Sequence, residues 1–397
     1  MTVNFLLALI ASAFFFAGFQ ALFPTLPLYV EHLGGGAADN GLVTLAFTAT
    51  AVISRPYIGG IADRGGRKPM LLVGALIFTL APLWCAASDS VAMLAAARAF
   101  QGLGIAAFTT AFQALIVDMS PPDKRGQWLG LSANATALAL VVGPLAGDAI
   151  LARFGFTVLF VMAALSALVS ALVSAAVRPP VSQQRRAAPF WTGLREVLVQ
   201  RGLYSGLLGM SLLGVVFGVF MTFIPRYALD FQLGAPGSFF TAYALAMLAI
   251  QPIAGGLSDR TGRARVAVPG LALAGLAVLL LAGAHTSWTA LSATFLYGLA
   301  AGAARVAIDG MVADSVLPHQ RATAAALQFT CFDLCIGLGS ALLGPVAQAG
   351  SYPAMYAIAG ALVAAGALPF WLLTRRRHLT KRIFCTMAKD CSKINHE

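Results

Sequence analysis

Four charged side chains lie inside long apolar stretches of this sequence: Arg98, Arg305, Asp309 and Asp333. A charged residue at the centre of a bilayer costs at least about 2.5 to 3.5 kcal/mol on insertion scales, so such residues tend to serve a function. A carboxylate in that setting can take up and release a proton when its surroundings change. These residues are therefore candidates for proton coupling or for contact with a substrate.

Arg305 and Asp309 are four residues apart, which places both on one face of a helix. Together with Asp333 they predict a buried charge cluster in the second half of the chain, in which Asp309 or Asp333 carries the proton. A permanent packing salt bridge is the alternative, because an aspartate that stays fully paired with Arg305 also stays ionised.

Arg98 lies about eight residues into its segment, roughly 12 Å from the outer end and close to the middle of the membrane. We expect it to face a water-filled cavity or a carboxylate partner. The alternative is a structural bridge to a polar side chain such as Gln101 or Gln113.

Three further charges lie nearer to the ends of apolar segments. Arg55, just before Pro56, is placed to contact an anionic substrate, to reach the surface or to brace the adjacent loop, and we favour bracing. Glu31 and Asp148 are expected near outer helix ends, as entrance or interfacial groups.

The composition identifies a membrane protein. Of 397 residues, 59% are hydrophobic and 10% charged, and the mean hydropathy is +0.82; soluble proteins carry about a quarter charged residues. The apolar blocks are long enough to cross a hydrocarbon core of about 30 Å as helices. We predict an all-α membrane protein with twelve transmembrane helices in two pseudo-symmetric six-helix bundles, the helices covering residues 4–30, 41–62, 70–88, 90–117, 128–149, 156–177, 202–229, 237–258, 266–284, 287–313, 324–348 and 352–374.

The distribution of basic residues predicts the orientation. With both termini in the cytoplasm, 21 of the 26 Lys and Arg residues lie in inner loops or the tail, as the positive-inside rule requires. The net charge of +11 therefore reflects topology, and no basic groove for nucleic acid is present.

An internal repeat divides the chain. The phrase "GGIADRGGRKP" at 59–69 returns as "GGLSDRTGRAR" at 255–265, and a shift of 196 residues also pairs Gly102 with Gly298 and Asp118 with Asp314. Repeated halves are typical of secondary transporters, whose substrate site lies between them. We expect an N-terminal bundle at 1–177, a linker at 178–201, a C-terminal bundle at 202–374 and a basic cytoplasmic tail at 375–397.

The repeated phrase has a physical interpretation as a conformational latch. Gly59 and Gly60 have no side chain, so another helix can approach closely there. A carboxylate just beyond the apolar span can face the positive end of a neighbouring helix and pair with loop arginines. Such contacts can form when one side of the protein closes and break when it opens. The predicted latch consists of Gly59, Asp63, Arg64, Gly66, Arg67, Lys68, Asp118, Asp259, Arg260 and Arg263.

Three motifs resemble the major facilitator superfamily. The phrase at 59–69 matches its loop signature G-x-x-x-D-R-x-G-R-[RK], "RAFQGLG" at 98–104 resembles its helix 4 motif, and "AxxxGPLAGD" at 139–148 resembles the helix 5 antiporter motif. The last match is imperfect, because Ala139 and Asp148 replace the outer glycines. The resemblance implies a twelve-helix drug:proton antiporter or sugar-efflux type of exporter, with Arg98 linked to proton coupling; the antiporter motif would consist of Gly143, Pro144, Gly147 and Asp148.

The expected function is proton-coupled export of a small amphipathic organic molecule by alternating access, by a monomer in a bacterial inner membrane. The partners would be that substrate, protons and lipid. A proton-coupled importer of a sugar or organic anion remains possible, and so does, less readily, a non-transporting receptor. Neither a catalytic constellation nor a nucleotide-binding loop is present in the sequence, and neither cofactor nor metal is expected.

Overall fold

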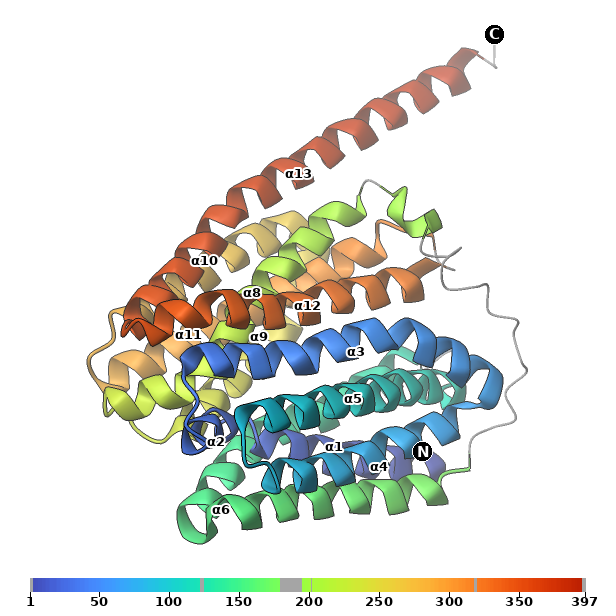
Figure 1. Ribbon diagram of the computed structural model, residues 1–397. Helices are drawn as coiled ribbons and strands as arrows, with labels where there is room; N and C mark the ends of the chain where they lie inside the picture. Colours follow the sequence, from blue (N-terminus) through green and yellow to red (C-terminus); the bar gives the residue numbers. More distant parts are fainter. Residues whose placement is uncertain (1–2, 122–124, 179–194, 201, 318–319, 395–397) are drawn as a thin grey trace.

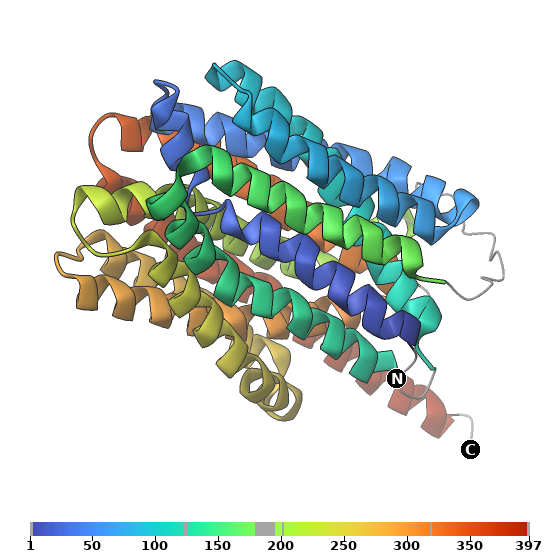
Figure 2. The same ribbon diagram turned by 90° about the horizontal axis from the view of Figure 1, so that it is seen from below.

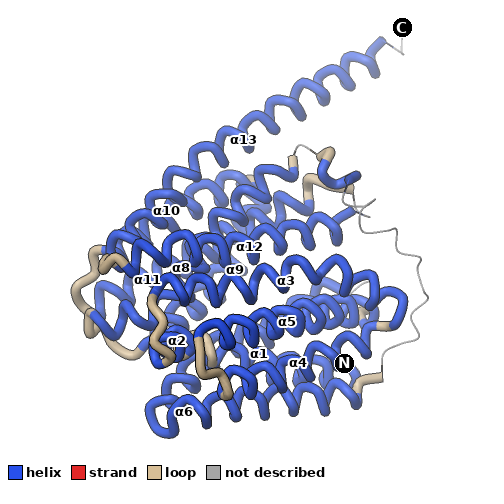
Figure 3. The backbone as a smooth tube through the Cα atoms, in the orientation of Figure 1, coloured by secondary structure: helices blue, strands red, loops and turns tan. Residues whose placement is uncertain are grey.

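The computed structural model describes residues 3–121, 125–178, 195–200, 202–317 and 320–394. Within these ranges the regular secondary structure is entirely helical, joined by short loops (Figure 3). The main helices are α1 (Val3–Ala21), α2 (Leu26–His32), α3 (Ala37–Gly65), α4 (Arg67–Ala86), α5 (Val91–Met119), α6 (Arg125–Ala176), α8 (Leu203–Asp230), α9 (Pro236–Thr261), α10 (Arg263–Ala282), α11 (Ser287–Ala313), α12 (Arg321–Gln348) and α13 (Tyr352–Ile394).

Among the described residues, eleven helices are long and apolar enough to cross a membrane. One of them holds two of the predicted spans. α6 contains Gly155 in a non-helical conformation with φ of 79°, a value that favours glycine, and the helix folds back there (Figure 2). The predicted spans 128–149 and 156–177 lie on either side of this break.

The first predicted span, 4–30, is wrong as a continuous helix. α1 ends at Ala21 and the short helix α2 begins at Leu26. Pro24 and Pro27 lack backbone N–H groups and disfavour the preceding turn of a helix, and the helix breaks around this pair of prolines. α2 lies across the end of the bundle (Figure 1), where its acidic residue Glu31 contacts the other half of the chain.

The helices form two bundles, α1 to α6 and α8 to α13, which lie against each other in Figure 1. Aromatic and aliphatic side chains such as Phe15, Phe108 and Tyr297 are buried inside the bundles. Large apolar side chains such as Leu172, Trp288 and Leu342 are exposed on the outside, as expected for a surface that faces lipid rather than water. The protein is a multi-pass membrane protein.

Both termini lie at the same end of the bundle (Figures 1 and 2). We call this the basic end, because it also carries the repeated basic loops around residues 66 and 262. The end that carries α2 and residues 231–235 is the far end. α13 continues as a helix to Ile394, past residue 374, and its membrane-length part is Tyr352–Arg375. Residues 179–194 and 201 of the predicted linker lie outside the described residues.

Candidate functional site

Two ion pairs at the basic end repeat each other across the halves. Arg67 Nε lies 3.4 Å from Asp118 Oδ2, and Arg263 Nε lies 3.3 Å from Asp314 Oδ2. Each pair joins an arginine at a helix amino terminus to an aspartate at the carboxyl end of the next helix. Both charges oppose the dipoles of their own helices, so pairing them relieves an unfavourable interaction at each end. These contacts hold helices together within one half.

The remaining latch residues lie around these pairs. Lys68 Nζ donates to the Ala175 carbonyl over 2.6 Å, Arg263 also pairs with Asp259, and Arg260 is exposed. Gly66 and Gly262 have φ of 93° and 105°, so both copies of the turn need glycine. The side chains of Asp63 and Arg64 lie outside the described part of the chain.

Close helix approach at Gly59 and Gly60 is absent from this conformation. A Cβ built on either glycine would meet no atom within 4 Å. Close approach occurs instead toward the far end of the same helix, where a Cβ on Gly41 would lie 2.3 Å from the Ser340 carbonyl oxygen of α12. A Cβ on Gly337 of α12 would likewise lie 2.0 Å from Thr48 Oγ1. Here the two halves are in backbone-level contact.

A charged contact joins the two halves at the far end. Glu31 Oε2 of α2 lies 2.8 Å from Arg226 Nη1 of α8, and Arg226 Nε lies 2.8 Å from Asp230 Oδ1. Burial raises the pKa of the Glu31 carboxyl above its ordinary value, although the Arg226 guanidinium opposes this rise; the Asp230 carboxylate adds to it. Glu31, expected as an entrance or interfacial group near an outer helix end, contacts the other half in this conformation.

The segment that resembles the antiporter motif packs on two sides. A Cβ on Gly143 would lie 2.6 Å from Gln20 Cβ of α1, and one on Gly147 would lie 2.0 Å from the Ala21 carbonyl oxygen. On another side Asp148 accepts a hydrogen bond from the Gly237 N–H in the first turn of α9. α9 has no side-chain cap of its own. Asp148 therefore caps a helix of the other half, where the helix dipole favours negative charge.

Further polar contacts join the halves between the far end and the middle. Thr44 of α3 is 3.2 Å from Thr222 of α8, which is 3.0 Å from Ser340 of α12. Nearest to the basic end, Arg55 Nη2 lies 2.6 Å from Asp333 Oδ2, with each side chain 21% exposed. These two residues are about 15 to 18 Å from the basic ends of α3 and α12, well inside both helices. Arg55 therefore does not brace the basic loop; it pairs across the interface.

The predicted cluster of Arg305, Asp309 and Asp333 forms only in part. Both carboxylates experience the charge of Arg305, but Asp309 accepts a hydrogen bond from Gln328 and Asp333 pairs with Arg55. The Arg305 guanidinium instead lies over the rings of Phe332, at 4.8 Å, and Phe329, at 5.4 Å. The predicted cluster is therefore incomplete, because Arg55 of the other half pairs with Asp333.

Arg98 is buried without a carboxylate partner among the described residues. Its guanidinium donates to Gln101 Oε1 and lies 4.3 Å from the centre of the Phe47 ring. Arg98 Nε and Gln101 Nε2 have no hydrogen-bond partner in the described structure. Of the contacts considered for Arg98, the bridge to Gln101 is present in this conformation.

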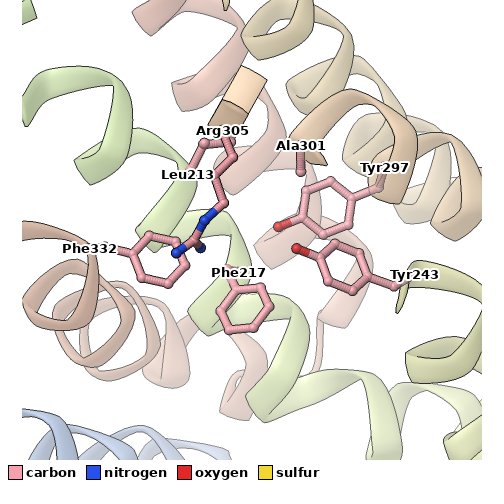
Figure 4. Close-up of a pocket in the computed structure, with 7 residues that line it drawn as sticks. All are labelled: Leu213, Phe217, Tyr243, Tyr297, Ala301, Arg305 and Phe332. Carbon is pink, nitrogen blue, oxygen red and sulfur yellow. The ribbon is translucent and has the colours of Figure 1, made fainter. Parts of the chain in front are cut away.

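A small recess with about 10 Å³ of free space lies inside the C-terminal half. Figure 4 shows the two tyrosine hydroxyls turned toward the side on which the Arg305 guanidinium and Phe332 lie, with Phe217 below them in this view. The Tyr243 and Tyr297 rings are 5.1 Å apart. The recess is lined by Leu213, Phe217, Tyr243, Tyr297, Ala301, Arg305 and Phe332.

Sequence reasoning missed the two tyrosines. A weak signal was available in the repeat, because the 196-residue shift pairs Tyr243 with Phe47 and Tyr297 with Gln101, the two residues that contact Arg98. Both tyrosines also carry a polar hydroxyl group in an otherwise apolar helix. As for metals, the described residues hold no group of three or more His, Cys, Asp or Glu side chains placed to bind an ion.

Known proteins resemble this chain along nearly its whole length. The multidrug resistance protein MdtG of Salmonella paratyphi A is 26% identical over 382 residues, which cover 91% of this chain and 93% of that protein. A bacterial homologue of the human lysosomal transporter Spinster, solved in an inward-facing, unoccupied conformation, has a TM-score of 0.82 at 17% identity, covering 94% of this chain and 96% of its own. The human organic anion transporter MFSD10 has a TM-score of 0.71 at 19% identity, covering 94% of this chain and all of its own.

The sequence model of the Major Facilitator Superfamily matches residues 8–240 and 231–383, which together include both repeated halves. The fold, with two bundles in contact along α3, α12, α6 and α9, agrees with that match. The chain belongs to the Major Facilitator Superfamily and is a membrane transporter, not an enzyme.

Proposed function

We propose that this protein is a proton-coupled antiporter that exports a small amphipathic organic molecule across a bacterial inner membrane. The substrate enters from the cytoplasm at the basic end, where Gly59 and Gly60 have open space around them in this conformation, and leaves after the far end opens. Both termini are cytoplasmic in this proposal, and one chain suffices for transport. The relation to a multidrug resistance protein supports this direction.

The ion pair between Arg55 and Asp333 carries the proposal. Among the described residues it is the inter-half polar contact nearest to the basic end, and Asp333 directly follows Phe332, which lines the recess. A proton on Asp333 removes the attraction that holds Arg55, because only the ionised carboxylate forms the pair. Proton binding and separation of the halves are thereby linked at one residue. Arg98 and Gln101 lie in the other half, as supporting polar groups of the same central region.

The basic loops act in the opposite phase of this cycle. In this conformation Arg67 and Arg263 make contacts within their own halves, and Gly59 has open space around it. When the basic end closes, Gly59 and Gly60 allow the halves to meet there. The latch residues then control the rate of conversion more than the affinity for substrate.

Transport by everted membrane vesicles tests the proposal. Vesicles whose lumen is more acidic than the medium should accumulate amphipathic dyes from a panel of anionic, neutral and cationic compounds. A protonophore should abolish the accumulation. Asp333→Asn should remove the dependence on the gradient, whereas Asp89→Asn, in an exposed loop, should behave as the parent protein. Accumulation that does not respond to any gradient contradicts proton coupling. Uptake into right-side-out vesicles, driven by a medium more acidic than the lumen, identifies an importer.

A further inference from the structure

The charged groups inside the transmembrane helices do not balance. Three arginines, Arg55, Arg98 and Arg305, lie in the middle region with two aspartates, Asp309 and Asp333. Asp333 is held by Arg55, and Asp309 accepts from Gln328. Among the described residues no carboxylate lies within ion-pair distance of Arg305 or Arg98. The central region therefore carries one excess positive charge in its ionised form.

Arg305 is the arginine that lines a space. Arg98 is 4% exposed and its guanidinium is taken up by Gln101 and Phe47. Arg305 instead has aromatic faces as its neighbours and forms one wall of the recess. An aromatic face is a weaker partner for a guanidinium than a carboxylate or phosphate group, which the planar fork can bind through two hydrogen bonds. Its charge is available to a ligand.

An unsatisfied donor faces the same space. Tyr297 is 1% exposed and its hydroxyl has no hydrogen-bond partner among the described residues. Buried polar groups are normally hydrogen-bonded, and this unpaired hydroxyl, at the wall of a recess, is free to donate to a group supplied from outside the chain. Figure 4 shows the Tyr243 hydroxyl beside it, on the side of the recess that faces Arg305. One guanidinium and two phenols thus converge, and all of them can donate to an oxyanion.

The remaining walls of the recess are apolar. Phe217 lies 5.7 Å from the Tyr243 ring and 5.5 Å from the Phe332 ring, measured between ring centres. Such walls suit a flat or aliphatic body next to the charged group. The free space between these side chains is about 10 Å³, room for one water-sized group, so in this conformation the recess admits an oxygen atom of an acidic group, and the body of the ligand lies beside it.

We propose that this recess binds the anionic group of an amphipathic organic acid, with Arg305 as its ion-pair partner and the Tyr297 and Tyr243 hydroxyls as hydrogen-bond donors. The proposal rests on the proposed function, since it names the substrate class of the same transporter. An organic cation, which the aromatic rings alone would attract, is the competing class. The positive charge of Arg305 would repel such a cation.

Three probes that differ only in charge test the class: 2-naphthoate, 2-naphthamide and 2-naphthylmethylammonium. Their affinities for the purified full-length protein in lipid nanodiscs are measured by titration calorimetry. We expect naphthoate to bind at least about tenfold more tightly than the amide, and the ammonium to bind least. Arg305→Gln should remove the preference for naphthoate while leaving amide binding within about twofold, and Arg305→Lys should restore part of it.

Tyrosine variants give a second test that does not alter charge. Tyr297→Phe keeps the ring and should weaken naphthoate binding by about fivefold. Tyr356→Phe is the matched control, because Tyr356 is equally buried with an unpaired hydroxyl but lies outside the recess; its affinity should not change. This pair keeps the test decisive even if Arg305→Gln fails to fold, which a thermal unfolding midpoint reveals.

Several outcomes overturn the ligand class: equal affinities for all probes, tighter binding of the ammonium, no binding of any probe, or a naphthoate preference that survives Arg305→Gln. The vesicle experiment is independent of these outcomes. Gradient-driven transport without a naphthoate preference removes only the ligand class, whereas naphthoate binding without gradient-driven transport removes only proton coupling.

Discussion

The two ends of the interface between the bundles differ in packing although the same helices form both. At the far end, Gly41 of α3 touches the backbone of α12 and Glu31 pairs with Arg226 of the other half. At the basic end, Gly59 and Gly60 of α3 have no neighbour within 4 Å, and the arginine pairs remain within single halves. Glycines allow close approach but do not produce it. The far end therefore differs from the basic end both in its close backbone packing and in the polar contacts that cross the interface.

The largest effect should come from adding bulk at the closed end. In Gly41→Leu the new side chain meets the Ser340 carbonyl and neighbouring backbone, which cannot move aside as a flexible side chain would. Overpacking of this kind costs about 1 to 3 kcal/mol, so we expect the far end to open and transport to fall at least about tenfold. Spin labels on His32 and Ala349, which are exposed on the two halves at the far end, report the opening as a longer distance.

Gly60→Leu is the matched control for that change. The side chain enters open space, so the distance between the His32 and Ala349 labels should stay as in the parent protein. An equal opening in both variants would show that the close packing at Gly41 is not what keeps the far end closed.

The charged contact at the far end should respond unequally to loss of its two partners. Arg226→Gln leaves Glu31 and Asp230 facing each other without a cation. Because the groups are partly exposed, we expect a loss of about 1 kcal/mol, or about a fivefold shift toward an open far end. Glu31→Gln removes a charge whose burial is unfavourable, so the far end should stay closed. An open far end in Glu31→Gln, measured with the same labels, would contradict this account.

The same residue predicts a dependence on pH. Burial raises the pKa of Glu31 in the closed far end above its ordinary value of 4.5, whereas an exposed carboxyl in an open far end keeps a value near the ordinary one. The closed state therefore binds the proton more tightly, and it gains population as the pH falls through the raised pKa toward 4.5. Label distances recorded between pH 7 and pH 4.5 should show this gain, and Glu31→Gln should abolish it.

The cap on α9 should have a smaller effect. Asp148→Ala removes the acceptor for the Gly237 N–H and the negative charge at the helix amino terminus. Loss of a cap costs about 1 kcal/mol, so the closed far end should lose about fivefold in population, and Asp148→Asn, which keeps an acceptor, about twofold. If both variants have the label distances of the parent protein, Asp148 does not help to hold the halves together.

The smallest effect is expected at the basic end. Arg67→Gln and Arg263→Gln each break a partly exposed pair within one half, and such pairs contribute about 0 to 1 kcal/mol. The label distance at the far end should therefore change little and equally in the two variants. A shift of more than about fivefold in either would mean that these loops already join the halves in this conformation.

Much of the fold could be predicted because long apolar stretches identify membrane helices. The 196-residue repeat shows the same pattern of helices and loops in both halves. The break after Ala21 was missed because Pro24 and Pro27 lie inside an otherwise continuous apolar stretch. Proline often occurs within membrane helices, so its presence alone does not predict a chain break.

The partners of the buried charges were predicted less well. Arg305 and Asp309 share a helix face, but Asp333 pairs with Arg55, which is 278 residues away on a helix of the other half. No local spacing reports that α3 and α12 meet. Tyr297 was missed for a related reason, since an aromatic residue in an apolar helix looks like packing until the recess beside it is seen.

Distances measured at both ends of one protein test the central claim most directly. Spin labels on His32 and Ala349 report the far end, and labels on Ile61 and Leu317, both exposed, report the basic end, in lipid with and without a pH gradient and substrate. We predict a short far-end distance and a long basic-end distance at rest, and opposite changes of the two during transport. Both distances changing in the same direction, or neither changing, would contradict alternating access about the Arg55 and Asp333 pair.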